Sequence, residues 1–102
     1  MEVKLAEHIR YSPERMVMET IHSCQDMRVL MINLAPGQML PPHTSSSSVI
    51  LQVVSGRGEI LTGGDWVPVE PGTVRFFPPQ ESHGIRATEE PVTVMATLAP
   101  RP

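Results

Sequence analysis

A turn, a lone histidine, a serine run and an apolar strand follow one another in the segment Gly37-Gln-Met-Leu-Pro-Pro-His43-Thr-Ser45-Ser-Ser-Ser-Val49-Ile-Leu-Gln-Val-Val-Ser-Gly56. The Pro-Gly pair at its start is typical of a tight turn. In the strand, residues 49, 51 and 53 share one face, and residues 50, 52 and 54 share the other. Because both faces are largely apolar, we expect the outer face to be covered by a neighbouring sheet or a second subunit.

A second segment downstream resembles the start of the first, as Gly72-Thr-Val-Arg-Phe-Phe-Pro78-Pro-Gln80-Glu-Ser-His83. Both segments run from a glycine to a histidine and pass a proline on the way. Together they indicate a pair of related motifs.

The composition favours short strands over helices. Eleven prolines and seven glycines occur in 102 residues, and proline breaks both helices and strand ladders. The pattern predicts one all-β domain over residues 1–102, with its core at about residues 28–98 and an N-terminal strand segment at residues 1–27. Ser12-Pro13-Glu14 predicts at most one helical turn. The expected strands are residues 16–22, 28–34, 49–54, 57–62, 66–69, 73–77, 83–88 and 92–98.

Charge and hydropathy exclude several classes of function. The net charge is −3 and the eight Lys and Arg residues are scattered, whereas binding nucleic acid needs clustered cations. No apolar run approaches the ~20 residues of a membrane-spanning helix, and the acidic N-terminus is unlike a signal peptide. Cys24 is the single cysteine, so no internal disulfide forms and we expect a cytoplasmic protein.

With both segments in view, the chain resembles a small single-domain cupin, whose fold is a double-stranded β-helix or jelly-roll barrel. The first cupin motif has the form Gly-x5-His-x-His-x3-Glu-x6-Gly, and its matches here are Gly37, His43 and Gly56. The second motif has the form Gly-x5-Pro-x-Gly-x2-His-x3-Asn, and its matches are Gly72, Pro78 and His83. The resemblance covers about residues 28–98 and implies the cupin barrel.

The resemblance also implies a metal site, of which this chain keeps half. Cupin metal sites use three histidines and one glutamate. Ser45 stands at the position of the second histidine and Val49 at that of the glutamate. His43 and His83 are the remaining ligands for a divalent transition metal, whereas catalytic zinc and non-haem iron sites usually have three protein ligands.

Three hypotheses follow for function, and they leave open whether the protein is an enzyme. In the first, a small molecule binds inside the barrel, with His43, Ser45 and His83 as polar contacts and Met31 and Met39 in an adaptable apolar wall. In the second, a metal-dependent dioxygenase or isomerase uses both histidines with a third ligand from outside the family pattern. In the third, the barrel is an assembly or regulatory module without chemistry.

Other residues have two interpretations each. Glu81, and His22 with Cys24, are candidate replacement ligands, or else a solvent-facing turn and a buried thiol. Arg75 and Arg86 are expected on a solvated outer face. The doubly apolar strand at residues 49–54, together with the habit of cupins of pairing their barrels face to face, predicts a homodimer.

Overall fold

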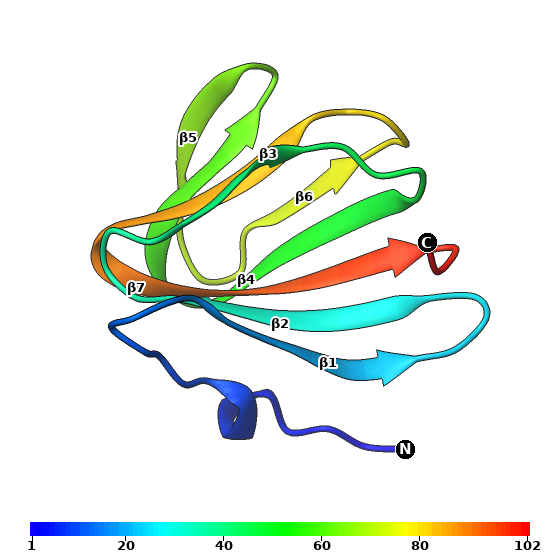
Figure 1. Ribbon diagram of the computed structural model, residues 1–102, viewed down its shortest axis with the longest axis horizontal. Coiled ribbons are helices and arrows are strands. Elements are labelled where there is room, and N and C mark those ends of the chain that lie inside the picture. The colour runs from blue at the N-terminus through cyan, green and yellow to red at the C-terminus, as the bar shows by residue number, and fades with distance from the viewer.

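The computed structural model describes residues 1–102 as a barrel of seven antiparallel strands with one short 3-10 helix (Figure 1). The elements are η1 (Leu5–His8), β1 (Val17–Ser23), β2 (Arg28–Leu34), β3 (Met39–His43), β4 (Ser48–Thr62), β5 (Asp65–Val69), β6 (Val74–Phe77) and β7 (His83–Ala99). The all-β prediction is confirmed. No helix is long and apolar enough to cross a membrane.

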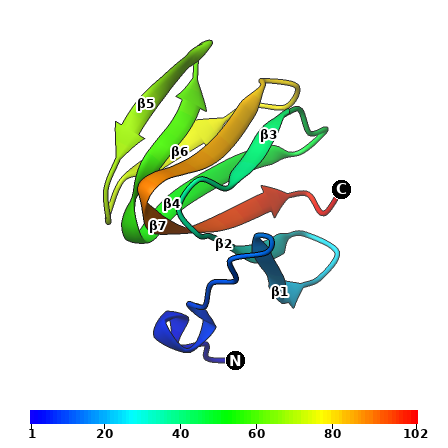
Figure 2. The ribbon, with the colours of Figure 1, turned by 60° about the vertical axis from the view of Figure 1, so that its left-hand side comes forward.

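The long strands β4 and β7 bend and take part in both walls of the barrel (Figure 2). In one wall, which we call the first sheet, the strand order is β1, β2, the second half of β7, the first half of β4, and β6. In the other wall, the second sheet, the order is β3, the first half of β7, the second half of β4, and β5. Alternate residues of both walls therefore meet in the barrel interior.

Two differences from the predicted strands have a local cause. Two expected pairs of strands are each one continuous strand in the structure. Residues 49–54 and 57–62 both belong to β4, and residues 83–88 and 92–98 both belong to β7. Register shifts between Val53 and Ser55, and between Gly56 and Gly58, turn the corner without ending β4, as β-bulges do. The N-terminal region contains the one helical turn that the sequence allows, but this turn, η1, lies before the start signal at Ser12-Pro13-Glu14.

The core consists of thirteen buried apolar residues, contributed by β2 and β4–β7. Residues 49, 51 and 53 of β4 are at most 3% exposed, and Ile50 on the other face is 37% exposed. The predicted alternation of this strand is thus confirmed. The core fills much of the barrel and leaves space at one end, where β3 and the start of β7 meet.

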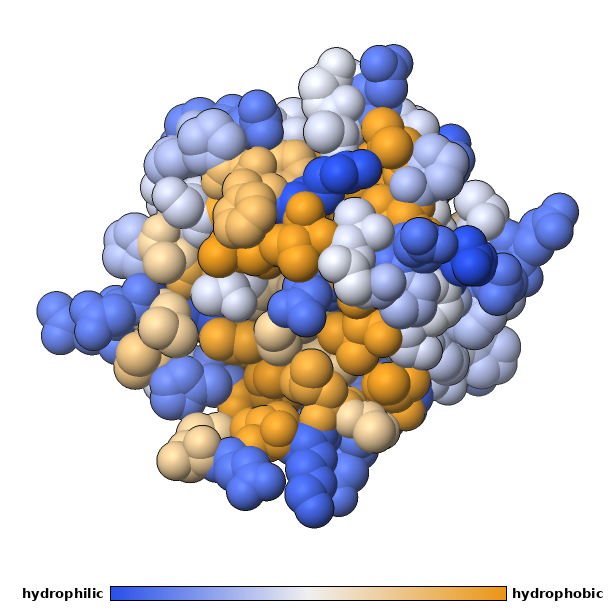
Figure 3. Space-filling view, turned by 180° about the vertical axis from the view of Figure 1, so that it is seen from behind, coloured by the Kyte–Doolittle hydropathy of each residue, from blue (hydrophilic) through white to orange (hydrophobic).

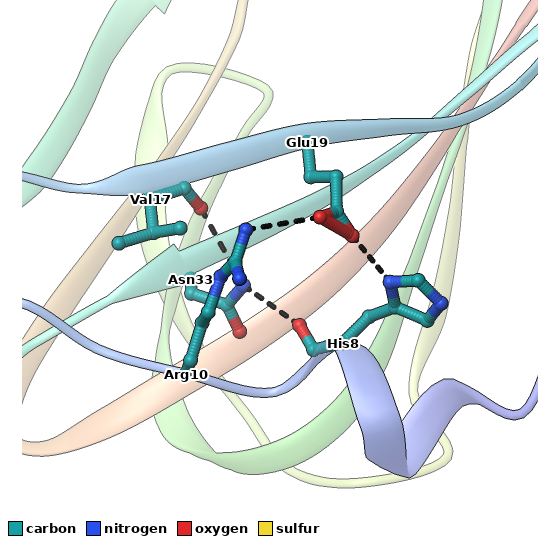
Figure 4. Close-up of polar contacts among 5 residues, drawn as sticks. All are labelled: His8, Arg10, Val17, Glu19 and Asn33. Atoms are coloured by element: carbon teal, nitrogen blue, oxygen red, sulfur yellow. Dashed lines mark hydrogen bonds and ion pairs between the residues drawn. The ribbon is translucent and has the colours of Figure 1, made fainter.

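The N-terminal segment is held against the first sheet by polar contacts (Figure 4). Asn33 of β2 donates from Nδ2 to the His8 carbonyl at 3.0 Å. Glu19 of β1 accepts from Arg10 Nη2 at 3.0 Å and from His8 Nδ1. These bonds tie the irregular segment to two neighbouring strands.

Candidate ligand-binding site

A small cavity of about 90 Å³ lies inside the barrel. Nine of its eleven lining residues are apolar and the other two are His43 and His83. The apolar residues are Met18, Leu30, Ile32, Leu40, Val49, Leu51, Ile85, Ala96 and Leu98. The cavity is therefore an apolar hollow with its polar groups confined to one pair of imidazoles.

The two histidines face each other because β3 and β7 place them in register. His43 at the end of β3 pairs with His83 at the start of β7, and paired residues project to the same face of a sheet. Their ring centroids are 4.4 Å apart in an edge-on arrangement. His83 is 4% exposed and packs on Phe77 at 5.2 Å between centroids, whereas His43 is exposed.

Backbone carbonyls fix the neutral tautomer of both rings. His43 Nδ1 lies 2.9 Å from the Pro41 carbonyl oxygen, and His83 Nδ1 lies 3.0 Å from that of Glu81. Because a carbonyl oxygen only accepts, each Nδ1 donates, and in the neutral ring Nε2 is left as an acceptor. Neither Nε2 has a partner within the protein, and that of His83 is not among the fully buried unpaired atoms. Both acceptors are therefore free to meet a ligand.

Burial lowers the pKa of His83 below its ordinary value of 6.5, and the charge of the neighbouring His43 lowers it further. The hydrogen bond to the Glu81 carbonyl acts in the opposite direction. His83 is consequently neutral at pH 7, with Nε2 available as an acceptor.

This shift predicts a dependence of stability on pH. The unfolded chain binds a proton at position 83 at higher pH than the folded chain does, so this contribution is complete above about pH 6.5 and declines as the pH falls. Urea unfolding measures the fall in unfolding free energy between pH 7.5 and pH 5.5. This fall should be larger for the wild type than for His83→Gln. His22→Gln, at an exposed position, should behave as the wild type does. Equal losses in all three proteins would contradict the assignment.

The structure does not bring the other three predicted contact residues to the cavity. Met31 is fully buried on the outer side of the first sheet, between Met95 and Glu19. Met39 is 46% exposed on the outer side of the second sheet, opposite Arg86. The expectation that these methionines form the cavity wall is wrong, because each projects to the face opposite its lining neighbours, Leu30, Ile32 and Leu40.

Ser45 lies in the turn between β3 and β4. Its Oγ accepts from the Ser47 amide at 3.1 Å and its carbonyl accepts from the Gln80 amide at 2.8 Å. Ser47 is 1% exposed and its hydroxyl donates to the Pro100 carbonyl. The serine run therefore organises the loops at this end of the barrel, and Ser45 is outside the cavity lining.

The two arginines differ in orientation. Arg86 lies on the outer face, as predicted, with Nε 2.6 Å from Glu59 Oε1 and the guanidinium 4.4 Å from the Trp66 ring centroid. Arg75 pairs with the inward-facing Leu51, so its predicted outward orientation is wrong. The exposed residues of that strand are Val74 and Phe76, and this reverses the expected alternation.

Met18 is the cavity residue that sequence reasoning missed most clearly. It lies on β1, is 45% exposed and reaches the cavity with its register partner Ile32. The alternation of Leu30 and Ile32 on β2 could have identified two further lining residues. Nothing in the sequence of β1 indicates that Met18, rather than Val17, faces the barrel.

Comparisons with known proteins agree with this geometry. Residues 30–98 match the family described as Cupin domain (Cupin_2). The chain belongs to the cupin family. Two crystal structures share 28% identity with it at a TM-score of 0.90: TT1209 from Thermus thermophilus, with 100% of each chain covered, and an RmlC-like cupin protein from Desulfovibrio desulfuricans, with 100% of this chain and 98% of that one covered. A search of curated proteins found no match.

A third structure extends the likeness in fold. It is an uncharacterized conserved protein with a double-stranded β-helix domain from Klebsiella pneumoniae. It is 22% identical, with a TM-score of 0.86 over 97% of this chain and 89% of that one. The jelly-roll architecture predicted from the two motifs is therefore confirmed.

Cupins often bind transition metals, but the residues of this cupin do not fit such a centre. Of the four ligand positions implied by the motifs, Ser45 is engaged in its own loop and Val49 is apolar. No group of three or more His, Cys, Asp or Glu side chains is arranged to hold a metal ion. Two imidazoles alone fall short of the three protein ligands of a catalytic centre.

The candidate replacement ligands do not complete the set. Glu81 is exposed, and its contact with His83 is through its backbone carbonyl. His22 lines a different, outer groove, and Cys24 lies in the turn after β1. None of these residues therefore supplies a third ligand beside His43 and His83.

Proposed function

We propose that this cupin binds a small, largely apolar molecule inside the barrel and holds its one polar group at His43 and His83. The observation that supports this most directly is the lining of the cavity, which has nine apolar side chains and two imidazoles. Pockets of this kind bind through apolar contact and use a few polar groups for orientation.

The protonation of the imidazoles defines the chemistry of the ligand. Both Nδ1 atoms are bound to carbonyls, so the free Nε2 atoms accept hydrogen bonds. The matching ligand group is an N–H or O–H donor. A carboxylate would meet two acceptors and no cation among the lining residues, and burying it there would be costly.

The ligand must also be small. A cavity of about 150 Å³ accepts benzene, whereas this one is about 90 Å³. We therefore propose a molecule with a compact apolar part, or a larger one whose polar end protrudes past the exposed His43.

Pyrrole and furan form a matched pair of probes for this proposal. Both are five-membered rings, but only pyrrole donates a hydrogen bond. At pH 7.5 we expect pyrrole to bind about 5- to 10-fold more tightly than furan, since a net hydrogen bond contributes about 1 kcal/mol. Titration followed by ¹H–¹⁵N spectra should move the amide signals of Leu51, Ile85 and Ala96.

Variants of the histidines provide the control. His43→Leu, at an exposed position, should retain the furan affinity and lose the preference for pyrrole. His22→Leu, on the outer side of the first sheet, should keep the preference. Binding of neither probe at millimolar concentration, or an unchanged preference in His43→Leu, would overturn the proposal.

The metal-dependent enzyme is separated from this proposal by metal content. Untagged wild-type protein, His43→Ala and His83→Ala can be compared by mass spectrometry after incubation with iron, manganese, nickel, zinc or copper. Stoichiometric metal in the wild type, lost in both variants, would replace the apolar-ligand proposal with a metal site.

We also propose that the protein is a cytoplasmic homodimer. The single cysteine supports a reducing compartment. The apolar outer face of β4 supports burial against a second copy, because Ile50 is 37% exposed there and Val54 is half-buried. A sedimentation coefficient of a monomer at micromolar concentration would contradict the homodimer.

A further inference from the structure

Phe76 is the most exposed large apolar residue outside the chain terminus, at 72%. It lies on β6, the edge strand of the first sheet, and projects away from the barrel, since its neighbour Phe77 is 2% exposed in the core. Val74, on the same face of β6, is 38% exposed. This edge of the sheet therefore presents an aromatic side chain with nothing against it.

The strand registers place Phe76 at one end of a row that crosses the outer face of the first sheet. Phe76 pairs with Ile50, Ile50 with Thr97, Thr97 with Val29, and Val29 with His22. The adjacent row on this face is Val74, Gln52, Met95, Met31 and Glu19. Apolar residues gather on the face of the molecule seen from behind in Figure 3.

A groove of about 320 Å³ lies at the opposite end of these rows. Six of its seven lining residues are hydrophobic: Met1, Val3 and Leu5 of the N-terminal segment, Ile21 of β1, Val29 of β2 and Met95 of β7, with His22 as the seventh. A cavity of about 150 Å³ accepts a benzene ring. The groove is therefore large enough for a phenyl group.

We infer that two copies of this chain pair through the first sheet about a twofold axis running along β7, so that Phe76 of each copy enters the groove of the other. β7 is the middle strand of the five, and rotation about such an axis reverses the rows and places β6 over β1 and β2 of the second copy. The surface is thus complementary to itself, as an isologous interface requires. The inference deepens the homodimer proposed above and depends on it.

Charge favours a second copy as the occupant. Seven residues of these two rows on β6, β4, β7 and β2 are exposed or partly exposed, Met31 being fully buried, and none of the seven is charged. Two copies, each with a net charge of −3, would approach here without opposing like charges. β1 and β2 have seven residues each and β6 has four, so at about 3.4 Å per residue and about 4.8 Å per strand the five-stranded sheet spans on the order of 500 Å². The N-terminal segment adds to this area, which lies below the ~800 Å² per partner of a stable interface.

Sedimentation equilibrium tests the role of Phe76. The wild type should be a dimer at micromolar concentration, and Phe76→Ala should raise the dissociation constant about 100-fold or more, because each dimer loses two buried aromatic anchors. Phe76→Asp should be a folded monomer, with folding checked by circular dichroism. Met39→Asp, on the exposed outer side of the second sheet, is the control and should remain a dimer.

Cross-linking tests the direction of the pairing. In a Cys24→Ser background, a mixture of Phe76→Cys and Val3→Cys chains should form an intermolecular disulfide on oxidation. Phe76→Cys alone should not, because the two Phe76 positions lie at opposite edges of the dimer.

The outcomes distinguish the two proposals. A wild-type monomer overturns both the homodimer and the pairing. A dimer unaffected by Phe76→Asp, or one that cross-links through Phe76→Cys alone, overturns the pairing and leaves the homodimer standing. Pyrrole binding in the barrel is measured independently of either result.

Discussion

Replacing Gly56 with alanine should destabilise the barrel by more than about 4 kcal/mol, a large share of the roughly 5–15 kcal/mol of a domain of ordinary stability. Gly56 adopts φ +76° at the corner of β4. A Cβ there would lie 1.9 Å from the Pro91 carbonyl oxygen and 2.9 Å from its carbon. Because both atoms belong to the backbone of β7, relief would require the two long strands to separate where the barrel bends. Urea unfolding followed by circular dichroism measures the effect.

Gly64→Ala is the matched control for this substitution. Gly64 has φ +88° in the turn between β4 and β5, and a Cβ there would meet nothing within 4 Å. Alanine should therefore cost only the ~1–2 kcal/mol of a left-handed backbone conformation. If the two variants lost similar amounts of stability, the contact with Pro91 would not be the determining factor.

Gly56 also shows how far the sequence predicts this fold. The spacing of Gly56 within the first motif helps to identify the barrel. Glycine is also a common turn residue, so its presence predicts that the strand at residues 49–54 ends there. In the structure the strand continues through it, because the bulges of β4 allow the pairing to pass from one wall to the other. Alternation of apolar residues indicates which residues face inward, but it does not distinguish a strand that ends from one that bends.

The sequence likewise predicts only part of the candidate site. The motif spacing identifies His43 and His83. The structure brings the two side chains together because β3 and β7 pair in a register that places these residues opposite each other. Met31 and Met39 were assigned to the cavity by residue type alone, and residue type does not say which face of a strand a side chain occupies. For Arg75 the face was assumed from its apolar neighbours, and the exposed Phe76 is the neighbour that misled the prediction.

Asn33→Ala should lower the unfolding free energy by about 2–4 kcal/mol, because it removes the centre of a buried polar network. Asn33 is 1% exposed and its Oδ1 accepts from Thr93 Oγ1 at 2.6 Å. Since that hydroxyl is already donating, Tyr11 donates to Thr93 Oγ1, also at 2.6 Å. With the bond from Asn33 Nδ2 to the His8 carbonyl, the amide joins β2, β7 and the N-terminal segment.

The loss should be local as well as global. Without Asn33, amide exchange should accelerate between His8 and Val17, because the segment loses its bond to β2 while the core remains packed. Tyr11→Phe is the control, since Tyr11 is 36% exposed and should lose about 1 kcal/mol or less. An Asn33→Ala protein as stable as Tyr11→Phe would mean that the apolar contacts of the segment hold it in place.

In that case the groove that receives Phe76 would stay intact in the Asn33→Ala variant, and dimerisation would be unchanged. If Asn33 does hold the segment, Asn33→Ala should weaken the dimer as well, because Val3 and Leu5 would leave the groove wall.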